Sequence, residues 1–144
     1  YDKEYAYSIG KVPAVTYFLL RRNDNKMVGT IDLRLELNDY LRNYCGHIGY
    51  SIRPTERRKG YNKINLYLCL LEAQKNRLEK VLITCADYNI GSRNSIKSFE
   101  GVLEKTTYNK SNDEKMELYW IDVNNAINKY RNEFEKFIER GDIT

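Results

Sequence analysis

The stretch that most constrains this chain is residues 49–71, GYSIRPTERRKGYNKINLYLCLL, because its character changes twice within a short span. Residues 49–52 are typical of the end of a strand, and Pro54 stops that strand. Residues 56–60 form a basic turn, and the apolar positions from Ile64 onward predict a helix. The predicted order is therefore strand, basic glycine turn and helix.

This order suits the binding of a phosphorylated ligand. The first turn of a helix carries unpaired backbone N–H groups and the positive end of the helix dipole, so it attracts anions. Gly60 lets a ligand approach the backbone, and four cations surround it, namely Arg53, Arg57, Arg58 and Lys59. We therefore expect a pyrophosphate site, although the single glycine fits neither a P-loop nor the dinucleotide fingerprint.

The turn resembles the acyl-CoA signature [QR]-x-x-G-x-[GA] of the GNAT superfamily of N-acetyltransferases, here RRKGYN at residues 57–62. Asn62 departs from the pattern, since Gly or Ala is usual there. The resemblance implies that acetyl-CoA is the acyl donor. It implies a diphosphate held by Arg57, Arg58, Lys59, Gly60, Tyr61 and Asn62.

A second segment resembles a later motif of the same superfamily. Residues 84–104, TCADYNIGSRNSIKSFEGVLE, follow a strand-like run and carry Asn89, Ser92 and Gly101 in the pattern N-x-x-S, helix, glycine. The resemblance implies that Asn89 contacts the pantetheine arm and that Ser92 lies near the cofactor or the departing thiol. Taken together, the similarity covers roughly residues 15–123.

The remaining patterns predict an α+β fold, with a GNAT-like twisted mixed sheet flanked by helices. The strands 47–52 and 81–85 are joined through a helix that ends near Asn76, so they should be parallel with a right-handed crossover. Asn89 should cap a helix over residues 90–99. The other expected elements are strands at 15–22, 27–37, 102–108 and 116–123, and a loop at 38–44.

We expect a single domain over residues 1–144, with a tail or remnant at 1–12 and a core at 13–123. Residues 124–144 predict an additional amphipathic helix, packed on its own domain or, less simply, on a partner. The resemblance implies that the hairpin of residues 15–37 corresponds to the second and third strands of the family. The usual first strand and first two helices would precede Tyr1.

Composition argues against several classes of protein. The net charge of +4 is spread along the chain and the 13 tyrosines mostly alternate as in strands, so we do not expect nucleic-acid binding. No apolar run reaches the roughly 18 residues of a membrane span. Cys45, Cys69 and Cys85 lack the spacing of a disulfide framework or a metal site, which favours a cytoplasmic protein without a metal.

The reaction implied by the resemblance is direct attack of an amine on the thioester of acetyl-CoA. Backbone N–H groups near Ile52 and Arg53 would polarise the carbonyl if the strand of residues 47–52 diverges from its parallel neighbour. The amine must be neutral to attack, and the candidate bases are Glu36, Asp39 and His47. For each of these three residues, the alternative to catalysis is a structural or solvent-exposed role.

The leaving thiolate usually receives a proton from a tyrosine seven positions after the motif asparagine, which here is Ile96. The alternatives are Ser92, Tyr88, another tyrosine or solvent. A catalytically weak acyl-CoA-binding module therefore remains an alternative, with a basic nucleic-acid adaptor as a third. The sequence leaves open the amine acceptor, whether a small amine, an aminoglycoside, an amino acid or a protein N-terminus, and it leaves open a homodimer.

Overall fold

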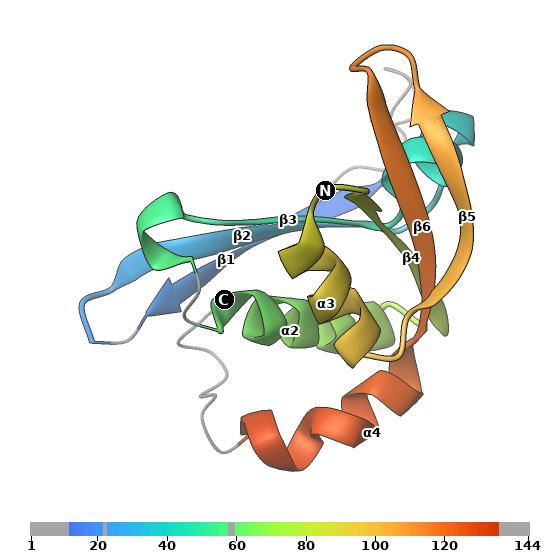
Figure 1. The fold of residues 1–144 in the computed structure, drawn as a ribbon. Helices are drawn as coiled ribbons and strands as arrows, with labels where there is room; N and C mark the ends of the chain where they lie inside the picture. The colour runs from blue at the N-terminus through green and yellow to red at the C-terminus, as the bar shows by residue number, and fades with distance from the viewer. Residues whose placement is uncertain (1–11, 22, 58–59, 136–144) are drawn as a thin grey trace.

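The computed structural model describes residues 12–21, 23–57 and 60–135. Within these residues, six strands form one mixed sheet in the order β1-β2-β3-β4-β6-β5 (Figure 1). This arrangement confirms the predicted α+β class. The elements are β1 (Ala14–Arg21), β2 (Lys26–Arg34), η1 (Leu41–Cys45), β3 (Ile48–Ile52), η2 (Pro54–Glu56), α2 (Tyr61–Lys75), β4 (Lys80–Ala86), α3 (Ile90–Ser98), β5 (Val102–Asn109), β6 (Glu114–Asp122) and α4 (Val123–Phe134).

The hairpin β1–β2 forms as predicted, but β2 ends at Arg34 rather than at residue 37. Its register supplies the reason. Ala14, the first residue of β1, pairs with Arg34, and the pairing of β2 with β3 ends at Leu33. Leu35 still donates its N–H to the Pro13 carbonyl at 2.8 Å, but neither β1 nor β3 extends beside the residues that follow.

The segment predicted as a loop at residues 38–44 contains a helical turn instead. Asn38 starts it, because its side-chain oxygen accepts a hydrogen bond from the Leu41 N–H at 2.9 Å. Gly46 ends it with a φ of +76°, and a Cβ there would lie 2.4 Å from the Leu82 carbonyl oxygen. Only glycine permits this close approach of η1 to β4.

β3 and β4 are parallel, as the intervening helix predicted, but they pair at only one position, Ile48 with Ile83. Past this pair the two strands separate, and Figure 1 shows β3 continuing beside β2 while β4 runs beside β6. Each half of the sheet is internally paired over most of its length. The opening between the halves is the feature that positions the site.

The α-helices of the described residues, α2, α3 and α4, pack on one face of the sheet and share its main core (Figure 1). Leu66 and Leu70 of α2 are fully buried and belong to the same core cluster as Ile83 of β4 and Ile121 of β6. The terminal helix α4 adds its own apolar stripe, with Ile127, Tyr130 and Phe134 in the same cluster. α4 therefore packs on its own domain as far as Glu135, and the rest of the predicted helix lies outside the described residues.

Candidate functional site

A cavity of about 600 Å³ lies where the end of β3 meets the first turns of α2 and α3. Both sequence motifs line it, although they are separated by β4 in the chain. Predicted cofactor-binding residues on its wall are Ile52, Arg57, Gly60, Tyr61, Asn62, Asn89 and Ser92. The structure adds Tyr50, Ser51, Glu56, Lys63, Gly91 and Ser95 to the wall. Arg58 and Lys59 lie outside the described residues.

The start of α2 has the properties of an anion site. Gly60 occupies the N-cap position with a φ of +83°, and no described side chain caps the helix. The N–H groups of the first turn are therefore available to a ligand on the cavity side. Lys63, which the sequence analysis did not single out, also lines this wall, and its Nζ lies over the Tyr130 ring, 4.9 Å from the ring centroid. Arg57 is oriented by a hydrogen bond from its Nε to the Ile52 carbonyl, at 3.1 Å.

Polar side chains connect α2 and α3 across the cavity. The Asn89 Oδ1 accepts a hydrogen bond from the Ser92 N–H at 3.0 Å, so Asn89 caps α3 as predicted. The Asn62 Nδ2 donates to the Ser95 Oγ at 3.0 Å. At the position where the family pattern has Gly or Ala, the Asn62 side chain thus joins the start of α2 to the middle of α3. The contacts of Asn62 and Asn89 with a cofactor stay predictions.

The unpaired edge of β3 presents backbone N–H groups to the opening. The Arg53 N–H donates to the Val28 carbonyl at 2.8 Å, which places Arg53 in a hydrogen-bonded pair with β2. Alternate residues of an antiparallel pair face the other side, so the N–H groups of Ile52 and Tyr50 point toward the separated β4. The prediction for the Arg53 amide is therefore wrong, because that amide is already bonded. Ile52 remains the predicted donor, and Tyr50 joins it.

Tyr50 is a residue of the site that the sequence analysis missed. Its side chain leaves β3 on the face that carries the helices, and its hydroxyl hydrogen-bonds the Ser92 hydroxyl. Burial raises the pKa of Tyr50, and the contacts with Ser92 and Asn62 oppose that rise. The signal in the sequence was its position two residues before Ile52, on the same face of the strand.

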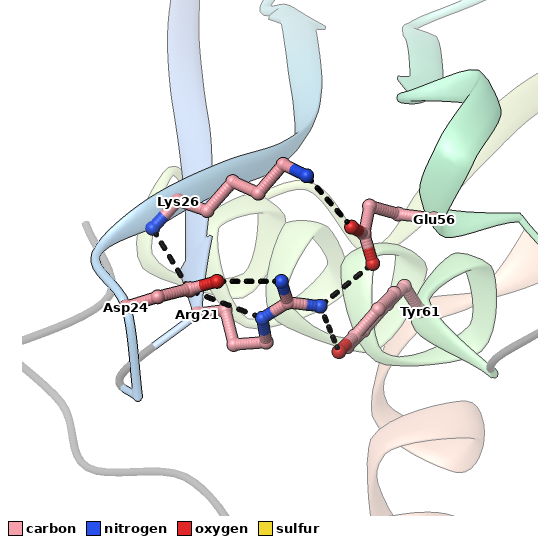
Figure 2. Close-up of polar contacts among 5 residues, drawn as sticks. All are labelled: Arg21, Asp24, Lys26, Glu56 and Tyr61. Carbon is pink, nitrogen blue, oxygen red and sulfur yellow. Dashed lines mark hydrogen bonds and ion pairs between the residues drawn. The ribbon is translucent and has the colours of Figure 1, made fainter.

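A charged network supports the turn before α2, as Figure 2 shows. Glu56, only 3% exposed, lies between Arg21 and Lys26, with N···O distances of 2.6 Å and 3.1 Å. Arg21 also donates to the Tyr61 hydroxyl at 3.3 Å and pairs with Asp24 at 2.7 Å. The Arg21 guanidinium lowers the pKa of Asp24 to about 2. The tip of the β1–β2 hairpin is thereby tied to the wall of the cavity.

The structure contradicts the prediction of His47 as a base. His47 is 7% exposed, and its Nδ1 accepts a hydrogen bond from the Leu82 N–H at 2.9 Å. Burial, with a smaller contribution from Arg34, lowers its pKa to about 4. The imidazole is therefore neutral and held within the sheet, edge-on to Trp120. It does not line the cavity.

The two carboxylate candidates also lie away from the cavity wall. Glu36 is exposed beyond the end of β2, and β2 places Gly29, not Arg34, beside Ile52. Asp39 is exposed at the turn before η1, where its carbonyl accepts a hydrogen bond from Asn43 at 2.8 Å. Neither is brought to the described cavity, so a basic role for Glu36 stays a prediction that depends on the acceptor.

The position of the usual catalytic tyrosine is part of the core. Ile96 is 0% exposed and packs with Phe99, so no side chain there faces the cavity. Tyr88, one of the predicted substitutes, is 69% exposed and donates to the Glu114 carboxylate at 2.9 Å. Tyr88 does not line the cavity either. Ser92 does, and it is the predicted substitute that the fold brings to the site.

All three cysteines lie within the described residues. Cys45, Cys69 and Cys85 form no disulfide, and Cys69 and Cys85 are buried. Burial raises the pKa of the Cys85 thiol to about 11 and that of Cys69 still further, so neither is a reactive thiolate. Within the described ranges, no cluster of three or more His, Cys, Asp or Glu residues has the geometry of a metal site. No helix there has the length and apolar character needed to cross a membrane.

Comparison with protein-family models matches residues 1–99 to the acetyltransferase (GNAT) family. The match covers more than half of the chain, and the protein therefore belongs to this family. The resemblance seen in the two motifs is confirmed. No match was found among curated proteins.

Solved structures agree on the fold. A ribosomal-protein-S5-alanine acetyltransferase from Vibrio fischeri is 18% identical with a TM-score of 0.63, over 76% of this chain and 62% of that chain. A mutant spermidine/spermine N-acetyltransferase from Vibrio cholerae is 15% identical with a TM-score of 0.65, over 87% and 76%. A Salmonella typhimurium protein solved with its cofactor acetyl-CoA is 12% identical with a TM-score of 0.53, over 67% and 58%. This chain thus spans less than two thirds of the length of the first of these structures.

Proposed function

We propose that this protein transfers an acetyl group from acetyl-CoA to a primary amine. The observation that carries the proposal is the cavity at the start of α2, which opens onto the unpaired edge of β3. A diphosphate fits the uncapped helix start, where Arg57 and Lys63 add positive charge. The adjoining N–H groups of Tyr50 and Ile52 fit the amide and thioester carbonyls of the pantetheine arm.

The reaction follows from this placement. The amine nitrogen attacks the thioester carbon, the N–C bond forms, the C–S bond breaks and its electron pair moves to sulfur. The N–H groups of Tyr50 and Ile52 would stabilise the negative charge that develops on the carbonyl oxygen. The proton of the attacking amine must leave to water or to a carboxylate. Glu56 is unsuited to this step because it is engaged with Arg21 and Lys26. Glu36 and Asp39 lie away from the cavity wall, so we propose that water takes the proton.

A second candidate function is an acyl-CoA-binding module without turnover. The observation that favours it is the burial of Ile96 at the position of the usual tyrosine. Both candidates require the same cofactor cavity. They differ only in whether thiol is released.

Two measurements test the proposal. Isothermal titration calorimetry with CoA and acetyl-CoA should show binding that Gly60→Asp abolishes, because its carboxylate would lie beside the diphosphate. Asn112→Asp, in the turn between β5 and β6, is the matched control for added charge, because the carboxylate can still accept from the Glu114 N–H. Unchanged CoA affinity in Gly60→Asp would contradict the assignment of the cavity.

Release of free thiol over a panel of amines then separates the two candidates. The panel should contain spermidine, an alanine-terminated peptide and an aminoglycoside, since two of the structural relatives are named for spermidine and for a ribosomal-protein alanine. Acetyl transfer to any of them supports an enzyme. CoA binding with no thiol release from any acceptor supports the binding module.

We also propose a cytoplasmic location. Three cysteines without a disulfide are expected in a reducing compartment. Localisation of a tagged full-length chain tests this directly.

A further inference from the structure

Tyr50 places a phenol inside the cavity. It lies on β3 between Gly49 and Ser51, and its hydroxyl reaches Ser92 in the first turn of α3. The ring packs against the core on the same face as its cross-strand partner Ile31. The strand therefore fixes the direction of the side chain, and Ser92 fixes its hydroxyl.

Two described tyrosines line the cavity, and their positions differ. Tyr61 stands in the first turn of α2 and its hydroxyl accepts a hydrogen bond from Arg21, so it belongs to the diphosphate end. Tyr50 stands on the unpaired edge of β3, where its own backbone N–H faces the opening. Its hydroxyl is therefore the phenol nearest to the amides that would hold the thioester.

We propose that the Tyr50 hydroxyl donates a hydrogen bond to the sulfur of the departing CoA thiolate, with Ser92 as the positioning residue. This inference rests on the proposed function. When the C–S bond breaks, its electron pair moves to sulfur, and the Tyr50 O–H donates to that sulfur while the Tyr50 oxygen accepts a hydrogen bond from the Ser92 hydroxyl. The thiolate afterwards takes a proton from water, since a free thiol has a pKa of about 8.5.

The environment of Tyr50 suits a donor that keeps its proton. Burial raises the pKa of Tyr50, so the phenol stays protonated at neutral pH. It can therefore donate a hydrogen bond to the thiolate and adds no negative charge beside it. In a site shielded from water, a hydrogen bond to an anion is stronger than one to a neutral group. The positive end of α3, nine residues long, adds to the same effect.

The other groups that the sequence suggested for this role are placed elsewhere. Ile96 is buried in the core, and the Tyr88 hydroxyl is directed to Glu114 at the surface. Ser92 alone would provide a weaker acid with a shorter reach. Its hydroxyl is already paired with Tyr50, which makes Ser92 the residue that positions the donor.

The test uses Tyr50→Phe, which keeps the packed ring and removes only the hydroxyl. The ultraviolet absorbance of the thiolate, followed against pH in the complex with CoA, reports the pKa of the bound thiol and needs no turnover. A lost hydrogen bond to the thiolate should raise that pKa by about one. With acetyl-CoA and a good acceptor, kcat should fall about 10- to 100-fold. CoA affinity, measured by calorimetry at a pH where the thiol is protonated, should not change.

Two further variants make the test specific. Tyr88→Phe removes an exposed tyrosyl hydroxyl of the same chemistry and should leave both readouts unchanged. Ser92→Ala should give a smaller change in the same direction, and it keeps the cap of α3 because Asn89 bonds the Ser92 backbone. Circular dichroism of each variant verifies folding, and Ser92→Ala carries the test if Tyr50→Phe does not fold.

The outcomes are distinguishable. A bound-thiol pKa that is the same in wild type and Tyr50→Phe would overturn the inference, even if kcat fell, because the loss would then be structural. Failure of the wild type to bind CoA would overturn the proposed function itself. A raised thiol pKa in Tyr50→Phe but not in Tyr88→Phe supports the inference whether or not an acceptor has been found.

Discussion

The Nη1 of Arg21 lies 2.6 Å from the Oε2 of Glu56, which ties the tip of the first hairpin to the wall of the cavity (Figure 2). The hairpin is thereby part of the site although it contributes no lining residue of its own to this cavity. The carboxylate of Glu56 would repel a bound diphosphate if it were not compensated. Arg21 and Lys26 supply that compensation.

Replacing Arg21 tests this compensation. We expect Arg21→Met to weaken CoA binding about fivefold, because Glu56 would lose its ion pair with the Arg21 guanidinium. Asp24→Asn, which alters an exposed partner of the same guanidinium, should have little effect on CoA affinity. Calorimetry at low and high salt measures both. The double variant Arg21→Met with Glu56→Gln should recover affinity, and a double variant as weak as the single one would refute the charge argument.

The left-handed conformation of Gly60 leads to a second prediction. A Cβ at this position would have open space around it, so Gly60→Ala meets backbone strain alone, about 1 kcal/mol. We expect the turn to shift and CoA affinity to fall. Gly60→Asn should retain more of the affinity, because asparagine tolerates positive φ better than alanine. Equal affinities for the two variants would indicate that the conformation of residue 60 does not matter for binding.

Burial of His47 makes stability depend on pH. Its folded-state pKa of about 4 lies below the ordinary value of 6.5, so the unfolded chain binds the extra proton between these values. The contribution of the neutral imidazole is complete above pH 6.5 and is lost as the pH falls to 4. It amounts to at most about 3 kcal/mol.

Urea unfolding of wild type and His47→Asn across this range measures the effect. Asparagine places an acceptor close to the position of Nδ1 and can keep the bond from the Leu82 N–H, but it does not titrate. The wild type should lose more stability than the variant between pH 6.5 and pH 4. Parallel curves for the two proteins would contradict a depressed pKa at His47.

Asn89 has one structural role and one predicted binding role, and substitutions separate them. Asn89→Ala removes the cap of α3 and should lower the free energy of unfolding by about 1 kcal/mol. Asn89→Asp keeps an oxygen for the Ser92 N–H and should retain stability, yet it adds negative charge to the cavity wall. We expect its CoA affinity to fall. Urea unfolding and calorimetry on the same samples distinguish a cap from a ligand contact, and full affinity in Asn89→Asp would exclude the contact.

Local patterns gave the parts of this site that depend on neighbours in sequence. Gly60 before an apolar helix, and Asn89 before another, were sufficient to predict both helix starts. The amphipathic repeat of α4 predicted its packing, because its period alone selects the face that becomes buried.

Contacts between distant residues could not be predicted in the same way. The Tyr50 hydroxyl meets Ser92, 42 positions later, and Glu56 meets Arg21, 35 positions earlier. The error at Arg53 has a similar origin, since a shift of one residue in the register of β2 and β3 exchanges bonded and free amides. His47 was a candidate base on its intrinsic pKa, and only the three-dimensional fold shows that it is buried against Leu82.

The two halves of the sheet are joined near one end only, by the pair Ile48 with Ile83 and the adjacent hydrogen bonds between His47 and Leu82, so hydrogen bonds fix the angle between the halves less than they fix each half. That angle is set by helices, since α2 contacts β2 and β3 while α4 follows β6 and contacts α2. The rings of Tyr67 and Phe134, with centroids 5.2 Å apart, lie at this junction. The width of the opening between β3 and β4 thus depends on hydrophobic packing that lies away from it. A smaller side chain at Phe134 would therefore change access to the cavity without changing any residue that lines it.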